Sequence, residues 1–153
     1  MTIERGRGDL LAADVDALVN PVNTVGVMGK GLALQVRKAF PDVFEAYRQA
    51  CKAGEVVIGR MHIVQRQTAP RVIVNFPTKR HWRQPSQLAY VRDGLRDLIQ
   101  QVRGLQLDMQ LASIAVPALG CGLGGLAWAE VKPLIVAAFD EVPEVRAVLF
   151  EPG

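Results

Sequence analysis

Short apolar runs that alternate with helical patterns are the feature that most limits what this chain can fold into. Several of the runs are almost continuously apolar, which is typical of strands covered on both faces. Expected strands lie at residues 16–21, 60–65, 72–76, 113–117 and 146–150, with a further one near residues 2–6. Expected helices lie at residues 31–40, 41–51, 86–103 and 127–139. This alternation predicts an α/β sandwich.

The helix expected at residues 86–103 has the clearest pattern. Its apolar residues recur at intervals of three and four, as on one face of a helix; they are Leu88, Val91, Leu95, Leu98, Ile99 and Val102. Ser86 follows Pro85 and is the expected N-cap. Gly104 is expected to end the helix, because glycine is common just past a helix C-terminus.

Composition limits the class of protein. A chain of 153 residues, half of them hydrophobic, suits one domain with one core. The polar N-terminus predicts no signal peptide, and no apolar run reaches the roughly 20 residues that span a bilayer. Two cysteines, Cys51 and Cys121, have neither metal-site spacing nor the pattern of a disulfide framework. We therefore expect a cytoplasmic monomer without membrane association, metal or cofactor.

Charge is distributed unevenly along the chain. The formal net charge is +3, yet residues 56–92 contain seven basic residues and no acidic one. The remaining residues have 11 basic and 15 acidic side chains, a balance of −4. Two interpretations stay open for this basic block (residues 56–92): a local site for an anionic partner, or a basic face neutralised by solvent ions.

Two glycine clusters follow expected strands and precede expected helices. We call residues 22–31 the first glycine loop and residues 120–125 the second glycine loop. A loop between a strand and a helix directs backbone N–H groups and a helix N-terminus toward one point, where an anion can bind. Tight turns are the alternative role for these glycines. Gly124 and Gly125 are not followed by Lys-Ser or Lys-Thr, which excludes a Walker loop, and the first glycine loop lacks the G-x-G-x-x-G spacing after its strand. Lying side by side, the two loops could hold a diphosphate from both sides.

Polar residues near these loops offer ligand contacts. Asn20 and Asn23 carry amides that can bind ribose hydroxyls, although asparagine also stabilises turns. Asp9 follows Gly8 shortly after the first expected strand. Its carboxylate can accept a hydrogen bond from an adenine amino group or from the N-terminus of a helix. Local sequence does not choose between these two roles.

A segment of cations and aromatic rings follows the strand expected at residues 72–76. This basic-aromatic segment (residues 79–83) consists of Lys79, Arg80, His81, Trp82 and Arg83. Indole and guanidinium groups are suited to stacking on bases and pairing with phosphates. Lys79 is nearest the strand end, and neighbouring cations disfavour its charged form, which suits a base or a nucleophile. The alternative is an exposed basic loop.

Three motifs together resemble the macrodomain family, which binds ADP-ribose, and the match covers the whole chain. They are Gly8-Asp9-Leu10-Leu11, then Val19-Asn20-Pro21-Val22-Asn23 with residues 26–31, then residues 117–128. The resemblance implies a three-layer α/β/α fold with a central mixed, mostly parallel sheet over residues 1–153. Pro77-Thr78-Lys79-Arg80 and residues 120–123 resemble the branch of the DarG antitoxins and the human terminal ADP-ribose glycohydrolase. Antitoxins of this branch usually carry a further C-terminal region.

The resemblance also implies a site. Its ADP-ribose-binding residues would be Asp9, Leu10, Asn20, Asn23, Val27, Met28, Gly29, Thr78, Gly120, Cys121, Gly122, Leu123 and Gly124. Asp9 would face the adenine, the first glycine loop would border the distal ribose, and the second glycine loop would wrap the diphosphate. Lys79 matches the catalytic lysine of the branch. Arg80, His81, Trp82 and Arg83 would contact DNA.

The activity implied is removal of ADP-ribose from thymidine in single-stranded DNA, where a DarT-type toxin attaches it. One departure is Gly124, which stands where the human glycohydrolase has a catalytic aspartate that resolves a lysine adduct. We therefore expect Lys79 to act as a hydrogen-bond donor or general acid/base while water, oriented by Asn23, attacks the ribose. The alternatives are a module that binds ADP-ribose without cleavage, and a hydrolase of protein-linked or acetylated ADP-ribose.

Overall fold

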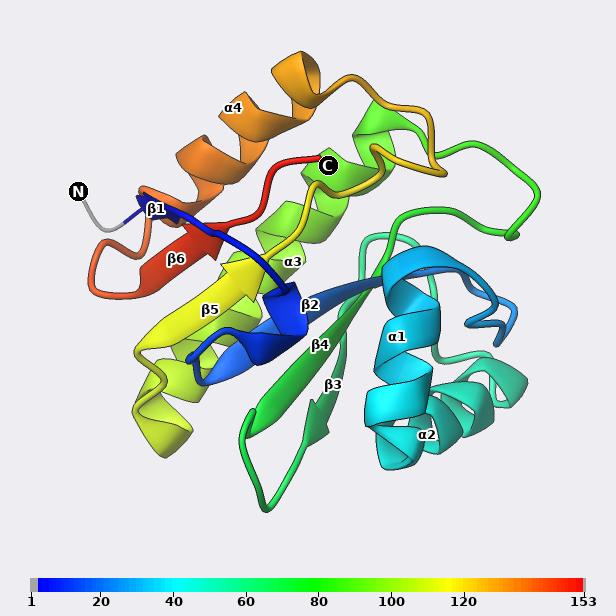
Figure 1. The fold of residues 1–153 in the computed structure, drawn as a ribbon, viewed down its shortest axis with the longest axis horizontal. Coiled ribbons are helices and arrows are strands. Elements are labelled where there is room, and N and C mark those ends of the chain that lie inside the picture. The colour runs from blue at the N-terminus through cyan, green and yellow to red at the C-terminus, as the bar shows by residue number, and fades with distance from the viewer. Residues whose placement is uncertain (1–2, 153) are drawn as a thin grey trace.

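The computed structural model describes residues 3–152 and contains one six-stranded sheet with helices on both faces (Figure 1). The strands are β1 (Ile3–Arg5), β2 (Ala17–Val22), β3 (His62–Gln65), β4 (Val72–Pro77), β5 (Ser113–Val116) and β6 (Arg146–Leu149). The helices are α1 (Gly31–Ala39), α2 (Pro41–Lys52), α3 (Leu88–Met109) and α4 (Trp128–Phe139), with a short 3₁₀ turn η1 (Leu10–Ala12). The first expected strand began at residue 2, which lies outside the described residues.

The sheet is mixed and mostly parallel, which confirms the predicted fold class. Its order is β1-β6-β5-β2-β4-β3, and every neighbouring pair is parallel except the antiparallel pair β3 and β4. Parallel strands need crossover connections, and here these are helices that cover the sheet faces. All six residues of β4 are buried, as expected for a strand covered on both sides.

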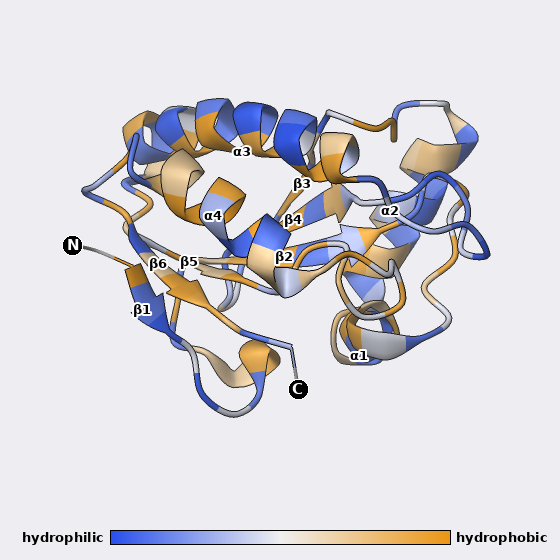
Figure 2. Ribbon diagram, turned by 90° about the horizontal axis from the view of Figure 1, so that it is seen from above, coloured by the Kyte–Doolittle hydropathy of each residue, from blue (hydrophilic) through white to orange (hydrophobic). Residues whose placement is uncertain are grey.

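Two hydrophobic layers hold the helices to the sheet. Residues Ala17 and Val19 of β2 face the layer formed with α3 and α4, whereas Leu18 faces the layer formed with α1 and α2. This alternation follows from the two-residue period of a strand. Figure 2 shows the hydrophilic side of α3 turned away from the sheet and its hydrophobic side turned toward it. No helix in residues 3–152 is long and apolar enough to cross a membrane.

Two expectations for α3 were wrong. The helix continues through Gly104 to Met109 and ends at Gln110, whose φ of 56° lies in the left-handed region. Leu105 is buried and continues the apolar face, and its packing outweighs the roughly 1 kcal/mol that glycine costs within a helix. The N-cap residue is Gln87, without a side-chain cap, because the Ser86 hydroxyl donates to the carbonyl of Thr78 instead.

The strand order creates the place for a site. From the central strand β2 the chain turns to α1 on one face, whereas from β4 it turns to α3 on the opposite face. The carboxyl ends of β2, β4 and β5 lie at one edge of the sheet because these strands are parallel neighbours. Ligands of open α/β sheets bind in the crevice where neighbouring loops diverge in this way.

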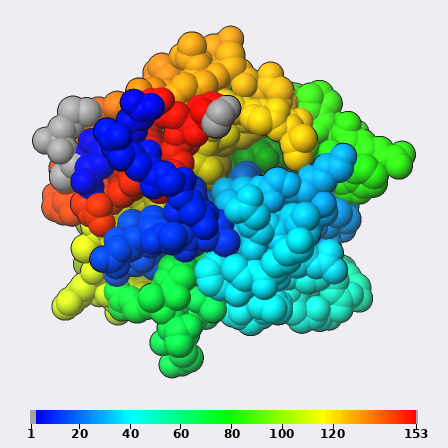
Figure 3. Space-filling model, viewed as in Figure 1, coloured from blue at the N-terminus to red at the C-terminus, as the bar shows by residue number. Residues whose placement is uncertain are grey.

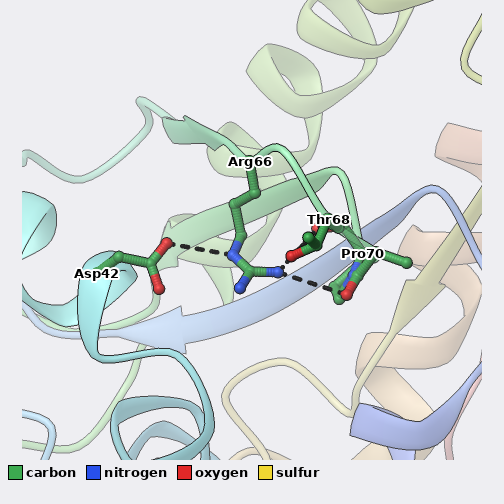
Figure 4. A network of polar contacts seen from close by, with 5 residues as sticks. Asp42, Arg66, Thr68 and Pro70 are labelled. Carbon is green, nitrogen blue, oxygen red and sulfur yellow. Dashed lines mark hydrogen bonds and ion pairs between the residues drawn. The ribbon is translucent and has the colours of Figure 1, made fainter.

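The turn between β3 and β4 is held at the opposite end of β4. The guanidinium of Arg66 donates to the carboxylate of Asp42 at 3.2 Å, which joins this turn to α2 (Figure 4). It also donates to the carbonyls of Thr68, Ala69 and Pro70 at 3.2–3.5 Å. Arg66 therefore stabilises the β3–β4 turn and does not contact a ligand at the crevice.

Candidate active site

A cavity of about 560 Å³ lies at the carboxyl ends of β2, β4 and β5. Figure 3 shows this hollow between α1, coloured light blue, and the yellow-to-orange segment after β5. Its wall consists of Pro21, Val22, Asn23, Val27, Gly29, Lys30, Gly31, Leu32, Ala33, Thr78, Lys79, Trp82, Pro117, Ala118, Gly120, Cys121, Gly122, Leu123 and Gly124. The volume suits a small-molecule ligand, and both glycine loops and the basic-aromatic segment contribute to the wall.

The structure brings most of the predicted site residues together. From the predicted set, the cavity wall includes Asn23, Val27, Gly29, Thr78, Lys79, Trp82 and all of Gly120 to Gly124. Asp9, Leu10, Asn20 and Met28 are outside the wall, as are Arg80, His81 and Arg83 of the basic-aromatic segment. The roles predicted for all these residues remain predictions.

The predicted residues outside the wall have structural contacts of their own. The Asp9 carboxylate accepts a hydrogen bond from the Leu11 N–H at 3.0 Å and caps η1, one of its two expected roles. Leu10 and Met28 are buried in the core. Asn20 is fully buried, and its amide donates to the side-chain oxygen of Asn75 at 3.0 Å.

Asn23 organises the first glycine loop. Its side-chain oxygen accepts hydrogen bonds from the Val25 N–H at 3.0 Å and the Tyr47 hydroxyl at 2.7 Å. Its amide donates to the Val27 carbonyl at 2.8 Å. Because that oxygen already has these donors, one amide hydrogen is the part of the side chain left for a ligand. Tyr47, a residue of α2 that the sequence did not single out, therefore supports the loop through Asn23.

The second glycine loop is packed too tightly for side chains at two positions. Gly120 has a φ of +71°, and a Cβ there would lie 2.7 Å from Leu126. A Cβ on Gly124 would lie 2.4 Å from the Gly120 carbonyl oxygen and 2.9 Å from the Cβ of Ser86. Gly124 is thus required by packing, and the backbone has no room for an acid at this position.

Lys79 lies in the cavity wall, partly exposed, and its amine donates a hydrogen bond to the Trp82 carbonyl at 3.3 Å. Burial lowers the pKa of Lys79, and the positive charge of Lys30 lowers it further. A lowered lysine pKa was expected from neighbouring cations. The cation that lowers the pKa of Lys79 is Lys30 of the first glycine loop, and the sequence around Lys79 could not identify it.

The basic block divides in the folded structure. Three of its seven basic residues have acidic partners: Arg66 pairs with Asp42, Arg71 with Asp16 and Arg92 with Asp93. Arg71 precedes β4 and Lys79 follows it, so roughly 20 Å of strand separates them. The basic block therefore does not form one continuous group of unpaired cations beside the cavity.

The cations near the cavity are a smaller group. Within residues 3–152, Lys30, Lys79, Arg80 and Arg83 form no ion pair. Three of them come from the basic-aromatic segment, and Lys30 comes from the first glycine loop. Unpaired positive charge beside an apolar-walled cavity favours an anionic ligand.

Among the described residues, neither a thiol nucleophile nor a metal site is found at the cavity. Burial raises the pKa of the Cys121 thiol, which contacts the Leu119 carbonyl at 3.7 Å and so is not an activated nucleophile. Across residues 3–152 no group of three or more His, Cys, Asp or Glu side chains is arranged to hold a metal ion. The groups of the cavity wall that can bind or react with a ligand are the amine of Lys79, the amide of Asn23 and the backbone N–H groups of the glycine loops.

Comparison with known proteins identifies the family. The Macro domain family model matches residues 19–135, so the chain belongs to the macrodomain family. The DNA ADP-ribosyl glycohydrolase of Mycobacterium tuberculosis is 53% identical over 153 residues, covering 99% of this chain and 42% of that protein. The DNA ADP-ribosyl glycohydrolase of Thermus aquaticus is 51% identical over 148 residues, covering 95% of this chain and 40% of that protein. The chain thus spans less than half the length of these relatives.

Solved structures agree with the sequence comparison. The macrodomain of Mycobacterium tuberculosis DarG has a TM-score of 0.94 and 52% identity, over 99% of this chain and 98% of that one. Thermosipho africanus DarTG, solved in complex with ADP-ribose, has a TM-score of 0.85 and 36% identity over 95% of this chain and 40% of that one. The resemblance to DarG-type macrodomains is confirmed.

Proposed function

We propose that this domain is an ADP-ribosyl glycohydrolase that removes ADP-ribose from thymidine bases in single-stranded DNA. The observation that carries the proposal is the identity of 51–53%, over at least 95% of the chain, with proteins named DNA ADP-ribosyl glycohydrolase. The cavity supports it, because a lysine of lowered pKa lies in a wall built largely from glycine loops. This combination suits a diphosphate ligand with a reactive sugar beside it.

The ligand would place its diphosphate between the second glycine loop and the start of α1. Helix α1 has no side-chain N-cap and no acidic residue in its first turn, so its free N–H groups favour an anion. Gly31 and Leu32 of this turn are in the cavity wall, and Lys30 adds a positive charge. The distal ribose would then lie between Asn23 and Lys79, and the adenine would extend toward Asp9 and Leu10.

The reaction would proceed by attack of water on the anomeric carbon of the distal ribose. The bond from that carbon to the thymine nitrogen breaks, and the base leaves with the electron pair. Protonated Lys79 donates a proton to the departing base, and the neutral amine that results accepts the proton that the attacking water loses. A lowered lysine pKa favours this transfer near neutral pH. The free amide hydrogen of Asn23 would hold a ribose hydroxyl or the water.

Gly124 argues against a two-step route through a lysine adduct. Resolution of such an adduct in the human glycohydrolase uses an aspartate that would correspond to Gly124, and a Cβ at this position would lie within 2.4 Å of the Gly120 carbonyl oxygen. Acetylated or protein-linked substrates would need no base-binding platform. One-step hydrolysis at a DNA base is therefore the better match to these residues.

The DNA strand would leave the cavity over the basic-aromatic segment. Trp82 is in the cavity wall, yet its side chain is 41% exposed. Its ring stacks on His81 at 5.1 Å between centroids, and the guanidinium of Arg83 lies 4.5 Å from its centre. A partly exposed indole held in this way can stack on a base while Arg80 and Arg83 attract phosphates.

We also propose that the domain opposes a DarT-type toxin, acting as a monomer in the cytoplasm. A Thermosipho africanus protein named as a fusion of DNA ADP-ribosyl transferase and DNA ADP-ribosyl glycohydrolase is 37% identical over 84% of this chain and 36% of that protein. That relative pairs attachment and removal in one polypeptide. Co-expression with a DarT-type toxin should restore bacterial growth for the wild-type domain and not for Lys79→Ala.

One assay tests the activity. The domain is incubated with a thymidine-ADP-ribosylated oligonucleotide and with a glutamate-ADP-ribosylated protein, and release of ADP-ribose is measured from each. We expect release from DNA, and a loss of about 10²–10⁴ in rate for Lys79→Ala, the usual contribution of a general acid. The control is Lys52→Ala, an exposed lysine of α2. Release from neither substrate would indicate a binding module, and release from protein alone would indicate a protein-directed hydrolase.

A further inference from the structure

Lys79 lies between two peptide carbonyls that hydroxyl groups from other segments hold. On its C-terminal side, the Thr24 hydroxyl donates to the Arg80 carbonyl at 2.8 Å, and the Thr24 N–H donates to the same oxygen at 3.2 Å. On its N-terminal side, the Ser86 hydroxyl donates to the Thr78 carbonyl. The backbone on each side of the lysine therefore has a side-chain anchor.

These anchors connect Lys79 to both glycine loops. Thr24 belongs to the first glycine loop and directly follows Asn23. Ser86 reaches the second glycine loop, because its backbone N–H donates to the Gly124 carbonyl at 2.9 Å. Hydrogen bonds thus join the two loops that would hold the ligand to the segment that carries the lysine.

The anchors matter because the sheet ends just before the lysine. The Thr78 N–H donates to the Val22 carbonyl at 2.9 Å, which continues the register of β2 and β4 by one residue. In the described part of the chain, the hydrogen bond of the Lys79 amine is to Trp82, within the same segment. That local contact does not tie the segment to the first glycine loop, whereas the bond from Thr24 to the Arg80 carbonyl does.

We propose that Thr24 is a positioning residue for Lys79, with Ser86 as its counterpart on the side of the second glycine loop. This inference rests on the proposed function, in which Lys79 contacts the substrate. Thr24 fixes the Arg80 carbonyl to the loop that would border the distal ribose, so the amine and the anomeric carbon keep a constant separation. Ser86 is buried, and therefore the partly exposed Thr24 is the better residue to test.

The first experiment compares two substitutions in the same position. Thr24→Val keeps the shape and the backbone hydrogen bond but removes the hydroxyl, whereas Thr24→Ser keeps the hydroxyl. We expect kcat on the ADP-ribosylated oligonucleotide to fall about tenfold in Thr24→Val, since small displacements of a reacting group cost this much or more. Thr24→Ser should restore it, and the ADP-ribose Kd should change less than about twofold in both. Thr68→Val, in the exposed β3–β4 turn, is the matched control.

A double variant tests whether Thr24 affects the rate through Lys79 or independently of it. If Thr24 acts through Lys79, adding Thr24→Val to Lys79→Ala should lower the residual rate no further. An additional tenfold loss in the double variant would overturn the proposal, because Thr24 would then act independently of the lysine.

A second readout needs no substrate. Burial and the charge of Lys30 lower the pKa of Lys79, so its NMR titration reports how the segment is held. Thr24→Val should move this titration upward toward that of an ordinary lysine, and Thr24→Ser should not. If the wild-type domain releases no ADP-ribose, the proposed function fails and this titration alone decides the positioning role. A Thr24→Val protein with wild-type titration overturns the role of Thr24 in either case.

Discussion

Gly124 provides the sharpest test of how the second glycine loop is built. A Cβ at this position would lie 2.4 Å from the carbonyl oxygen of Gly120, 2.9 Å from its carbonyl carbon and 2.9 Å from the Cβ of Ser86. Two of these atoms belong to the backbone and cannot move aside as the end of a flexible side chain would. Gly124→Asp should therefore fail to create a second catalytic group and should displace the loop instead.

The cost can be worked out from these contacts. Overpacking a tight site costs about 1–3 kcal/mol. Displacing residue 124 also breaks the hydrogen bond from the Ser86 N–H to its carbonyl, worth about 0.5–1.5 kcal/mol. The free energy of unfolding should then fall by about 1.5–4.5 kcal/mol, which lowers the Tm of a domain of this size by roughly 3–18 °C.

Two substitutions in the same loop make the measurement specific. A Cβ on Gly122 meets no heavy atom within 4 Å, and Gly122 has no positive φ, so Gly122→Ala should leave the Tm within about 2 °C of wild type. Tm is measured by differential scanning calorimetry, and ADP-ribose binding by isothermal titration calorimetry. A Gly124→Ala protein with wild-type Tm and affinity would refute this account. So would a Gly124→Asp protein that turns over faster than wild type.

Three further predictions concern charge, packing and pH. If Arg80 and Arg83 each contact a phosphate of single-stranded DNA, raising salt from 50 to 200 mM should weaken binding of the modified oligonucleotide about sevenfold more than that of free ADP-ribose; equal salt slopes would exclude these contacts. Gly94→Ala should destabilise the domain by about 1–3 kcal/mol, because its Cβ would lie 2.4 Å from a buried phenylalanine ring. Gly104→Ala, which meets open space in the same helix, should stabilise it by up to about 1 kcal/mol; urea unfolding measures both. Burial lowers the pKa of His62 below its ordinary value of 6.5, so the folded chain holds that proton less tightly than the unfolded chain. The stability contributed by the neutral His62 side chain is complete above pH 6.5 and is lost as pH falls through the lowered folded pKa. His62→Gln should therefore flatten the Tm-against-pH curve below pH 6.5. An unchanged curve would contradict the lowered pKa of His62.

Much of the fold could be predicted from local patterns. Short stretches of sequence predicted all six strands, several of them from nearly continuous apolar runs, and the boundaries of β4 and β5 were correct to within one residue. Both glycine loops were located correctly between a strand and a helix, since periodicity and glycine content are visible in short stretches of sequence. The same reasoning failed at Gly104, where a local helix-ending signal was weaker than the burial of Leu105 on the next turn.

The site depended on contacts between distant segments. Asn23 is a turn-former in sequence, but Tyr47, 24 residues later, occupies its oxygen and leaves one amide hydrogen for a ligand. The basic block is continuous in sequence, yet Arg66 and Lys79 are at opposite ends of the β3–β4 pair.

Sequence by itself determined the layers of this protein, its two glycine loops and the presence of a lysine at a strand end. These features are set by side-chain periodicity and glycine content within a dozen residues. Only the tertiary structure decided that the charge of Lys30 lowers the pKa of Lys79, that Thr24 and Ser86 anchor the backbone around it, and that Gly124 has no room for an acid. Each of these depends on atoms brought within a few ångströms by the parallel alignment of β2, β4 and β5, and a linear pattern does not encode such distances.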